Sequence, residues 1–204
     1  EVYINGINQS TIAYNYIFNK SDNLVELIWD DNINSCILMF YECINITEID
    51  LSNFNTSQVQ YMIGMFGGCT SLTSINLSNI NTSQVTDMFG MFFGCTSLTS
   101  LNLSNFDTSQ VIEMIAMFAG CSSLISLDLS SFDISQVEDM RLMLSGCSLL
   151  TSLDLSNFNA SKVRIMDNMF SDCINLEYIN LINFGPSQLP SYEDIFSNVQ
   201  ENIV

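Results

Sequence analysis

The chain has 204 residues, 48% of them hydrophobic, and its 22 acidic side chains outnumber 4 basic ones, which gives a formal net charge of −18. This charge excludes nucleic acid and anionic lipid as partners, because both are bound through clustered lysine and arginine. The absence of histidine removes the commonest general base and the commonest ligand of catalytic zinc. We therefore expect no enzymatic activity, no catalytic residue, no metal site and no cofactor.

A period of 26 residues organises the sequence, because both cysteine and methionine recur at this step. Such a period is typical of a solenoid, in which each coil buries its apolar face only against its neighbours. Six cysteines in one phase of the repeat form a row along the solenoid axis, and we expect them to be buried, unpaired thiols. They are Cys43, Cys69, Cys95, Cys121, Cys147 and Cys173.

In chain order, the coils begin degenerate and then become regular. Ile4, Ile7 and Ile12 follow the register of the later coils, and Leu24 and Leu27 begin the first complete strand pattern. The whole chain is predicted to be one elongated domain, residues 1–204, with a degenerate coil 1–23, a short coil 24–45, regular coils 46–184 and a partial last coil 185–204. The chain does not begin with methionine and shows no signal peptide, so we interpret it as a processed or excised piece.

Each regular coil combines two spacings. Leu98, Leu101 and Leu103 predict a strand, whereas the apolar positions from Val85 to Cys95 have helical spacing. An Asn or Asp cap before the helix, glutamine three residues later and glycine at its end support that assignment. The predicted fold is an α/β solenoid of about eight coils, with a parallel β-sheet on the concave face and short helices on the convex face.

The repeated string M-x-x-M-F-x-G-C-x-S-L-x-S-L-x-L-S-N-F-D-T-S-Q-V resembles the BspA-like leucine-rich-repeat surface proteins, in particular their mycoplasma-lipoprotein-type repeat of 25–26 residues. The resemblance covers roughly residues 24 to 184 and implies a leucine-rich-repeat fold, a cell-surface or extracellular location and a role in adhesion. No catalytic residue comes with it. Phenylalanine follows the strand where the classical leucine-rich repeat has asparagine, so we expect a stacked apolar spine in place of an asparagine ladder.

The concave face is the candidate binding surface, although its composition is small, polar and monotonous. Asp128 and Asp154 lie one strand apart, which leaves open a retaining glycosidase pair or a calcium site, the latter also at Glu48 and Asp50. A solvated polar ladder is the simpler interpretation. The face is formed by Asp50, Asn76, Asn102, Asp128, Asp154 and Tyr178. The sequons proposed for N-glycosylation are at Asn19, Asn45, Asn76 and Asn102.

The two ends of the chain lack polar caps, which suggests self-association. The last residues continue into the first as I-V-E-V-Y-I, which has the spacing of the missing strand. We therefore predict a scaffold or filament that continues head to tail, into a second copy or into further repeats of the same chain. The residues expected at these ends are Val2, Ile4, Ile7, Ile12, Ile195, Phe196, Val199 and Ile203. The alternative is an adhesin whose concave face binds a host protein, a surface protein or a glycan.

Overall fold

The structure is a computed structural model, and it describes residues 2–8, 24–27, 33–184 and 191–200. The chain divides into two compact units, Glu1–Asn32 and Ile33–Val204. Within the described residues no helix is long and apolar enough to cross a membrane. The two units are built differently, so they are described separately.

The first unit is a small antiparallel sheet in the order β2-β1-β3. Asn5 and Gly6, both with positive φ, connect β1 to β2 in a two-residue turn of the Asn-Gly kind that favours a hairpin. The strands are β1 (Val2–Ile4), β2 (Ile7–Asn8) and β3 (Val25–Leu27). The pattern that begins at Leu24 does mark a strand, β3, which pairs antiparallel with β1 within this unit.

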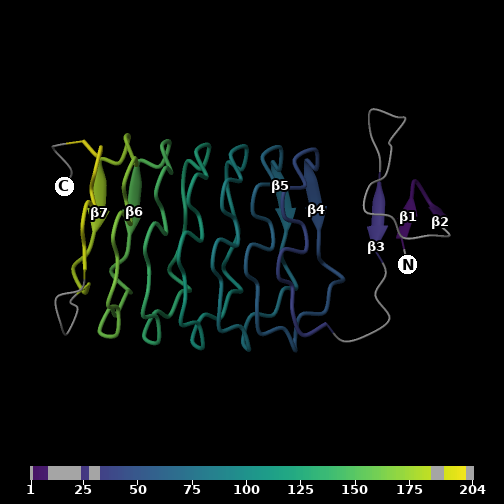
Figure 1. Cartoon of the computed structure of the whole chain (residues 1–204), viewed down its shortest axis with the longest axis horizontal. Coiled ribbons are helices and arrows are strands. Elements are labelled where there is room, and N and C mark those ends of the chain that lie inside the picture. Colours follow the sequence, from purple (N-terminus) through teal and green to yellow (C-terminus); the bar gives the residue numbers. More distant parts are fainter. Residues whose placement is uncertain (1, 9–23, 28–32, 185–190, 201–204) are drawn as a thin grey trace. The chain divides into compact units, whose positions relative to one another are not determined.

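The second unit is a stack of coils joined by parallel strand pairing, as the repeat predicted (Figure 1). Glu48 pairs with Ser74, and Ser152 with Tyr178, so each residue lies beside its equivalent one repeat later. The strands are short and bounded by turns: β4 (Glu48–Asp50), β5 (Ser74–Asn76), β6 (Ser152–Asp154) and β7 (Tyr178–Asn180). The curvature of the sheet and the total of about eight coils remain predictions.

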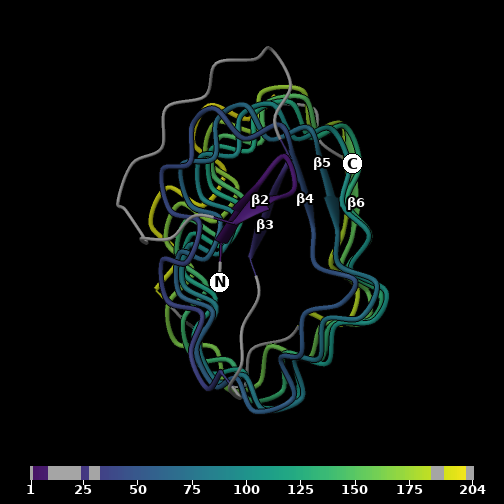
Figure 2. The ribbon, with the colours of Figure 1, turned by 90° about the vertical axis from the view of Figure 1, so that its right-hand side faces the viewer.

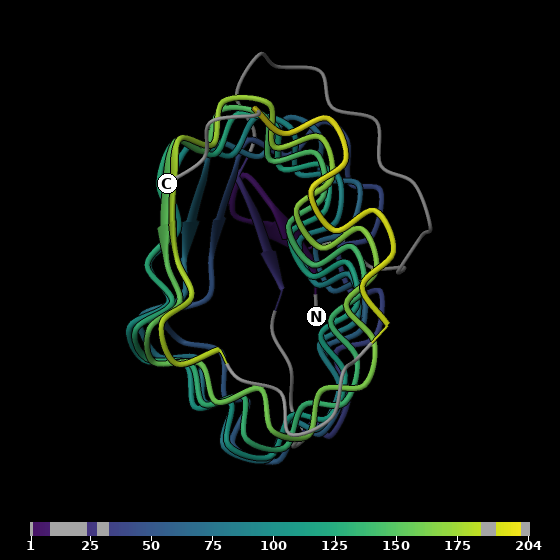
Figure 3. The same ribbon diagram turned by 90° about the vertical axis from the view of Figure 1, so that its left-hand side faces the viewer.

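On the other side of the unit the chain folds into successive tight turns (Figures 2 and 3). Residues one repeat apart form a continuous series of parallel bridges there, and we call this side the turn face. The series runs through Ser35, Tyr61, Asp87, Glu113, Asp139, Ile165 and Ser191. The strand side is called the strand face below.

The predicted helices are not present in the described residues, because the backbone of the turn face bonds between coils. The N–H groups of Met88, Gly90 and Phe92 donate to carbonyl oxygens of the next coil at 2.9–3.0 Å. Gly90 and Gly94 have positive φ, as the third residue of a type II turn requires, and this interrupts any helix every four residues. Gly94 therefore has the predicted left-handed conformation, but it closes a turn. The apolar residues have helical spacing because each successive tight turn places side chains in the interior at intervals of three or four residues.

Stacked side chains fill the space between the two faces. In the predicted aromatic spine, Phe106 stacks on Phe132 with ring centroids 6.3 Å apart and Phe158 on Phe184 at 6.5 Å. A second row of stacked rings, which was not predicted, includes Phe66 and Phe92 at 5.3 Å. The asparagine ladder, predicted to be missing, is also present one residue before that spine. Its side-chain amides donate to carbonyl oxygens of the preceding coil, from Asn79, Asn105, Asn157 and Asn183.

The cysteines are free in the structure, and five of the six in the predicted row are buried, whereas Cys43 is half-buried. Each of the five buried thiols of the row donates a hydrogen bond to a carbonyl of the preceding coil, such as Cys95 to Phe66 at 3.2 Å. Burial raises the pKa of Cys69 to about 11 and raises that of Cys95 further. These thiols are therefore protonated at neutral pH and act as small core residues.

A buried row of threonine hydroxyls closes the turn that follows the aromatic spine. The Oγ1 atom of Thr82 donates to the carbonyl of Asp107 and accepts its N–H, both at 2.8 Å, and Thr56 and Thr108 do the same one coil away. Ile134 occupies this position two coils after Thr82 and is also buried. The row thus satisfies backbone groups of the neighbouring coil only in the first part of the solenoid.

Replacing Thr82 by valine keeps the shape of the side chain and leaves two backbone groups of Asp107 without a partner. We expect Thr82→Val to lower the free energy of unfolding by about 2 kcal/mol, measured by urea denaturation. Ile134→Val is the matched control, because it truncates the same position without removing a hydrogen bond, and it should cost about 1 kcal/mol. Equal losses for the two variants would contradict the role assigned to the hydroxyl.

Candidate functional site

The strand face presents two columns of exposed small polar side chains, together with Tyr178. In the second column an Asp or Asn of each coil accepts, through Oδ1, the N–H of the residue two positions later. These distances are 2.8–3.2 Å in an Asx turn that repeats along the unit. The acceptors are Asp50, Asn76, Asn102, Asp128, Asp154 and Asn180, so five of the residues proposed for the binding face lie in one row, whereas Tyr178 belongs to the neighbouring column.

The carboxylates of this row are ionised more readily than usual. Hydrogen bonds from Ser156, first its hydroxyl and then its N–H, lower the pKa of Asp154, and the N–H and hydroxyl of Ser130 do the same for Asp128. For Asp50 the N–H of Ser52 is the main cause. One oxygen of each carboxylate is therefore engaged in the Asx turn, so the immediate role of these carboxylates is to accept hydrogen bonds from the neighbouring backbone.

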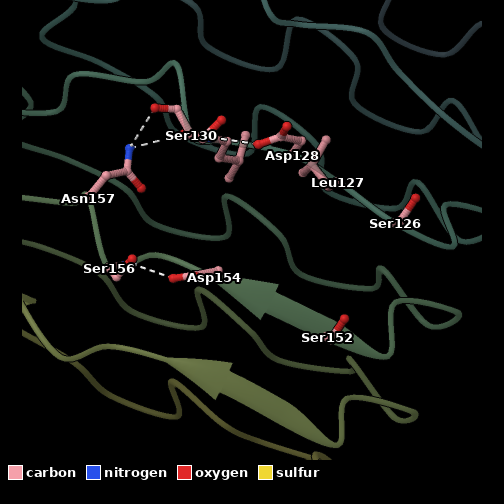
Figure 4. Close-up of a pocket in the computed structure, with 9 residues that line it drawn as sticks. Ser126, Leu127, Asp128, Ser130, Ser152, Asp154, Ser156 and Asn157 are labelled. Carbon is pink, nitrogen blue, oxygen red and sulfur yellow. Dashed lines mark hydrogen bonds between the residues drawn. The ribbon is translucent and has the colours of Figure 1, made fainter.

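A shallow hollow of ≈ 500 Å³ lies on the strand face around Asp128 and Asp154 (Figure 4). Its walls come from two successive coils, with Ser126 and Ser152 at one end and Asn157 at the other. The Asn157 amide is held by carbonyls of the preceding coil, including Leu129 at 3.1 Å. Tyr178 is the register partner of Ser152 and is 46% exposed, so one aromatic ring lies beside these hydroxyl and carboxylate groups.

Calcium and the glycosidase pair gain no support from this geometry. Among the described residues no three or more Cys, Asp or Glu side chains form a group suited to a metal ion. Asp128 and Asp154 also have the same environment, since both accept a serine N–H and both have a lowered pKa. General acid–base chemistry needs two carboxyl groups whose pKa values are pushed apart.

The asparagines proposed for glycosylation differ in whether their side chains already form hydrogen bonds. Asn45 is exposed in the turn that precedes β4, and Asn76 and Asn102 are exposed on the strand face. The side-chain oxygens of Asn76 and Asn102 already accept the N–H of Ser78 and Ser104 at 3.1 Å. Asn19 lies outside the described residues.

The strand predicted to join the last residues to the first remains a prediction, because residues 201–204 lie outside the described residues. Val2 and Ile4 belong to β1, which pairs with β2 on one edge and with β3 on the other. Ile7 is 69% exposed in β2. At the other end, Ile195 and Val199 are half-buried and Phe196 is 37% exposed. Ile12 and Ile203 lie outside the described residues.

A different feature at the C-terminal coil was not predicted. Alternate N–H groups of residues 166–172 donate to the carbonyls of Ser191, Glu193, Ile195 and Ser197 at 2.8–2.9 Å. One repeat later, no described residue accepts from the equivalent N–H groups, which belong to Tyr192, Asp194, Phe196 and Asn198. We call this row of four N–H groups the donor edge. The sequence did not indicate the donor edge, because the apolar spacing predicted a helix, and in a helix these N–H groups would bond within the segment.

The first coil of the second unit has the complementary property. The carbonyls of Tyr61, Ile63, Met65 and Gly67 accept N–H groups from the coil before them. One repeat earlier, no described residue donates to the equivalent carbonyls, which belong to Ser35, Ile37, Met39 and Tyr41. We call this row the acceptor edge. The two edges have the same spacing and opposite hydrogen-bonding character.

The turn face also carries a row of acidic side chains on successive coils, at Asp87, Glu113 and Asp139. Arg141 forms an ion pair with Asp139 at 2.8 Å. Burial, followed by the charges of Asp139 and Asp87, raises the pKa of Glu113, and its Oε2 atom is buried with no hydrogen-bond partner in the described part of the chain. This carboxylate is therefore unfavourably placed at neutral pH.

The comparisons with known proteins agree with the repeat. Two overlapping stretches, residues 13–126 and 113–202, match the family described as "Mycoplasma protein of unknown function, DUF285". The chain belongs to this family. The match confirms the resemblance to BspA-like leucine-rich-repeat proteins that the M-x-x-M-F and L-x-x-L-x-L spacings indicated.

Solved structures similar to this DUF285 chain are leucine-rich-repeat proteins. The leucine-rich-repeat protein of T. pallidum is 20% identical, with a TM-score of 0.55, over 83% of this chain and 72% of its own length. This likeness supports the solenoid fold alone. A leucine-rich-repeat protein of Bacteroides ovatus is 22% identical, with a TM-score of 0.44, over 92% of this chain, which spans 55% of that protein. No curated protein matches the chain.

Removing the charge of Asp154 and removing the charge of Glu113 should have opposite effects on the stability of the fold. Because the folded pKa of Asp154 is depressed, its charge adds stability above the unfolded pKa of about 4, and this stability is lost as pH falls through the folded pKa. The folded pKa of Glu113 is raised, so ionisation costs stability as pH rises through the range between its unfolded and folded pKa values.

We therefore expect Glu113→Gln to raise the Tm at pH 7, and Asp154→Asn to lower it slightly. Both differences from the unsubstituted chain should shrink as pH is lowered to about 3, measured by calorimetry. Asn76 and Asn102 show that asparagine is accommodated at the Asp154 position. A lower Tm for Glu113→Gln at pH 7 would contradict the assignment.

Proposed function

We propose that this chain is a non-enzymatic structural repeat protein of the cell surface or extracellular space that continues head to tail through the ends of its solenoid. The single observation that carries the proposal is the match between the donor edge, formed by residues 192–198, and the acceptor edge, formed by residues 35–41. Addition of a coil at either edge would repeat the hydrogen bonds that already join every internal pair of turns. The added coil comes from a second copy or from further repeats of the same chain.

Side-chain packing at the two edges supports the same arrangement. Phe40 stacks on Phe66 at 5.6 Å and Phe170 on Phe196 at 5.2 Å, so each terminal ring has one stacked face. A second copy placed on the donor edge would bring its Phe40 over Phe196 and extend the aromatic row. Burial of these partly exposed rings adds a hydrophobic contribution to the backbone bonds. A contact of this head-to-tail kind forms an open filament unless its rotation closes a ring.

Electrostatic repulsion opposes this assembly, because each copy carries a formal charge of −18. We expect linear oligomers to lengthen as sodium chloride is raised from about 0.05 to 0.5 M, since salt screens repulsion between exposed charges. Sedimentation velocity gives the size distribution, and negative-stain microscopy shows whether the oligomers are linear. Phe196→Asp should remain folded, because the side chain is partly exposed, and should weaken elongation about tenfold or more.

Tyr178→Ser is the matched control for elongation, because it changes an exposed aromatic residue on the strand face to the residue found at Ser152. It should assemble like the unsubstituted chain. The head-to-tail proposal fails if the unsubstituted chain stays monomeric across the salt series, or if Phe196→Asp elongates equally well.

The alternative is an adhesin that uses the strand face, and the exposed Tyr178 ring beside the hollow at Asp128 and Asp154 favours it. An aromatic face with nearby hydroxyl and carboxylate groups suits a glycan or a polar peptide from a surface protein. We expect Tyr178→Ser to reduce adhesion of the labelled chain to immobilised glycoproteins about tenfold. Phe196→Asp is the control here, because it should leave adhesion of the single chain unchanged. Equal adhesion by the Tyr178→Ser variant would remove this candidate.

A further inference from the structure

The turn face is apolar along one part of its length. The exposed fractions of Ile37, Leu38, Tyr41, Phe89 and Phe93 are 46%, 50%, 43%, 45% and 49%. No charged residue occurs in the turns 63–68, 89–94 and 115–120, although the chain as a whole is strongly acidic. We call these turns, together with Ile37, Leu38 and Tyr41, the apolar turn surface. Contiguous apolar surface of this kind on a soluble protein usually marks an interaction site.

The repeat itself shows that folding does not require these side chains. The position of Phe89 is occupied in later coils by Arg141, Asp167 and Glu193, and the coils there have the same bridges and turns. The position of Phe93 is occupied by Ser145, Ser171 and Ser197. Polar residues are thus accommodated at equivalent sites of the same molecule. The exposed aromatic residues therefore need an explanation outside the packing of the coils.

Large and small residues alternate from coil to coil in one column of this surface, that of Phe93. A Cβ atom on Gly67 would lie 2.9 Å from the Tyr41 ring, and one on Gly64 would lie 2.7 Å from Leu38, so these large side chains lie directly over glycines of the next coil. In the column of Tyr41 and Gly67 the next coil carries Phe93 and the coil after that Ala119, whereas the column of Phe89 keeps a large residue in the neighbouring coils, Ile63 and Ile115. Two coil spacings amount to about 10 Å, so raised rows and lower rows follow each other at that interval.

We propose that the apolar turn surface binds the same surface of a second copy of this chain, around a two-fold axis perpendicular to the solenoid. In a two-fold contact, residue i of one copy touches residue j of the other, and residue j of the first touches residue i of the second. One surface must therefore carry both the large side chains and the lower rows that receive them. The two-fold axis also separates the charged turns 141–146, 167–172 and 193–198 of the two copies. A parallel side-by-side arrangement would superpose those turns and their acidic residues.

The size of the surface agrees with a weak dimer. The five exposed apolar side chains each contribute on the order of 100 Å², given that aromatic side chains have about 150–250 Å² and about half of that is exposed. Each copy therefore buries about 500 Å², and the total of about 1,000 Å² is near the lower limit for specific interfaces. Anionic lipid is a poor alternative occupant, because a chain of charge −18 is repelled by it. The pairing is side to side and does not depend on the donor and acceptor edges.

The test uses sedimentation equilibrium of the full chain carrying Phe196→Asp, so that elongation does not contribute to the measured mass. From about 1 to 300 µM we expect a monomer–dimer equilibrium with a dissociation constant in the micromolar range. Adding Phe89→Asp and Phe93→Ser copies the residues of the coil at 167–171 and should weaken the dimer about tenfold or more. Ile125→Ser removes an exposed apolar side chain elsewhere, 56% exposed, and should leave the dimer unchanged.

Two results would overturn this proposal. The first is a Phe196→Asp chain that remains monomeric over the whole concentration range, including the case in which it floats with neutral phosphatidylcholine vesicles. The second is an unchanged dissociation constant in the doubly substituted variant. Far-ultraviolet circular dichroism and urea denaturation establish that the variant is folded. If Phe89→Asp impairs folding, Phe89→Arg, which copies Arg141, replaces it in the same measurement.

Discussion

Every coil of the second unit is tied to the next by backbone hydrogen bonds along the turn face, in which alternate N–H groups donate to carbonyls one repeat later. These bonds determine the rest of the local structure. An N–H group that bonds to the next coil is not available for a helix, and the segment must turn sharply to present such groups at every second position. Gly90 and Gly94 supply the positive φ that these turns need. Leu142 adopts positive φ as well, at the conformational cost that a branched side chain has there.

Much of this architecture could be predicted from the sequence, because the step of 26 residues is visible without any structure. The parallel register, the buried thiols and the phenylalanine spine all follow from residues that recur in one phase. The helices did not follow, since inward-pointing residues of consecutive tight turns, such as Met88, Met91 and Cys95, have the same spacing as one face of a helix. Only the backbone pairing distinguishes the two, and side-chain type does not report it.

The candidate site was predicted less completely than the fold. The residues from Asp50 to Asp154 share one phase of the repeat, but their engagement in Asx turns depends on the local backbone, which the spacing does not report. The N-terminal strands illustrate the same limit. Apolar spacing at Ile4 and Ile7 suited a solenoid coil, whereas Asn5 and Gly6 between them favoured a hairpin. The local turn preference prevailed over the repeat register there.

A repeat protein offers an internal means of separating residues that maintain the fold from residues that serve another purpose. Positions that keep one residue type in coil after coil, such as that of Cys95, are explained by contacts made in every coil. Positions that change from aromatic to charged, as Phe89 does to Asp167, are tolerated by the fold in either form. Because the neighbouring backbone is the same, the difference in exposed apolar area must act on something outside the coil. The exposed Tyr178, in a column otherwise made of serine and glutamate, follows the same reasoning, so the solenoid has two surfaces whose composition its own folding does not explain.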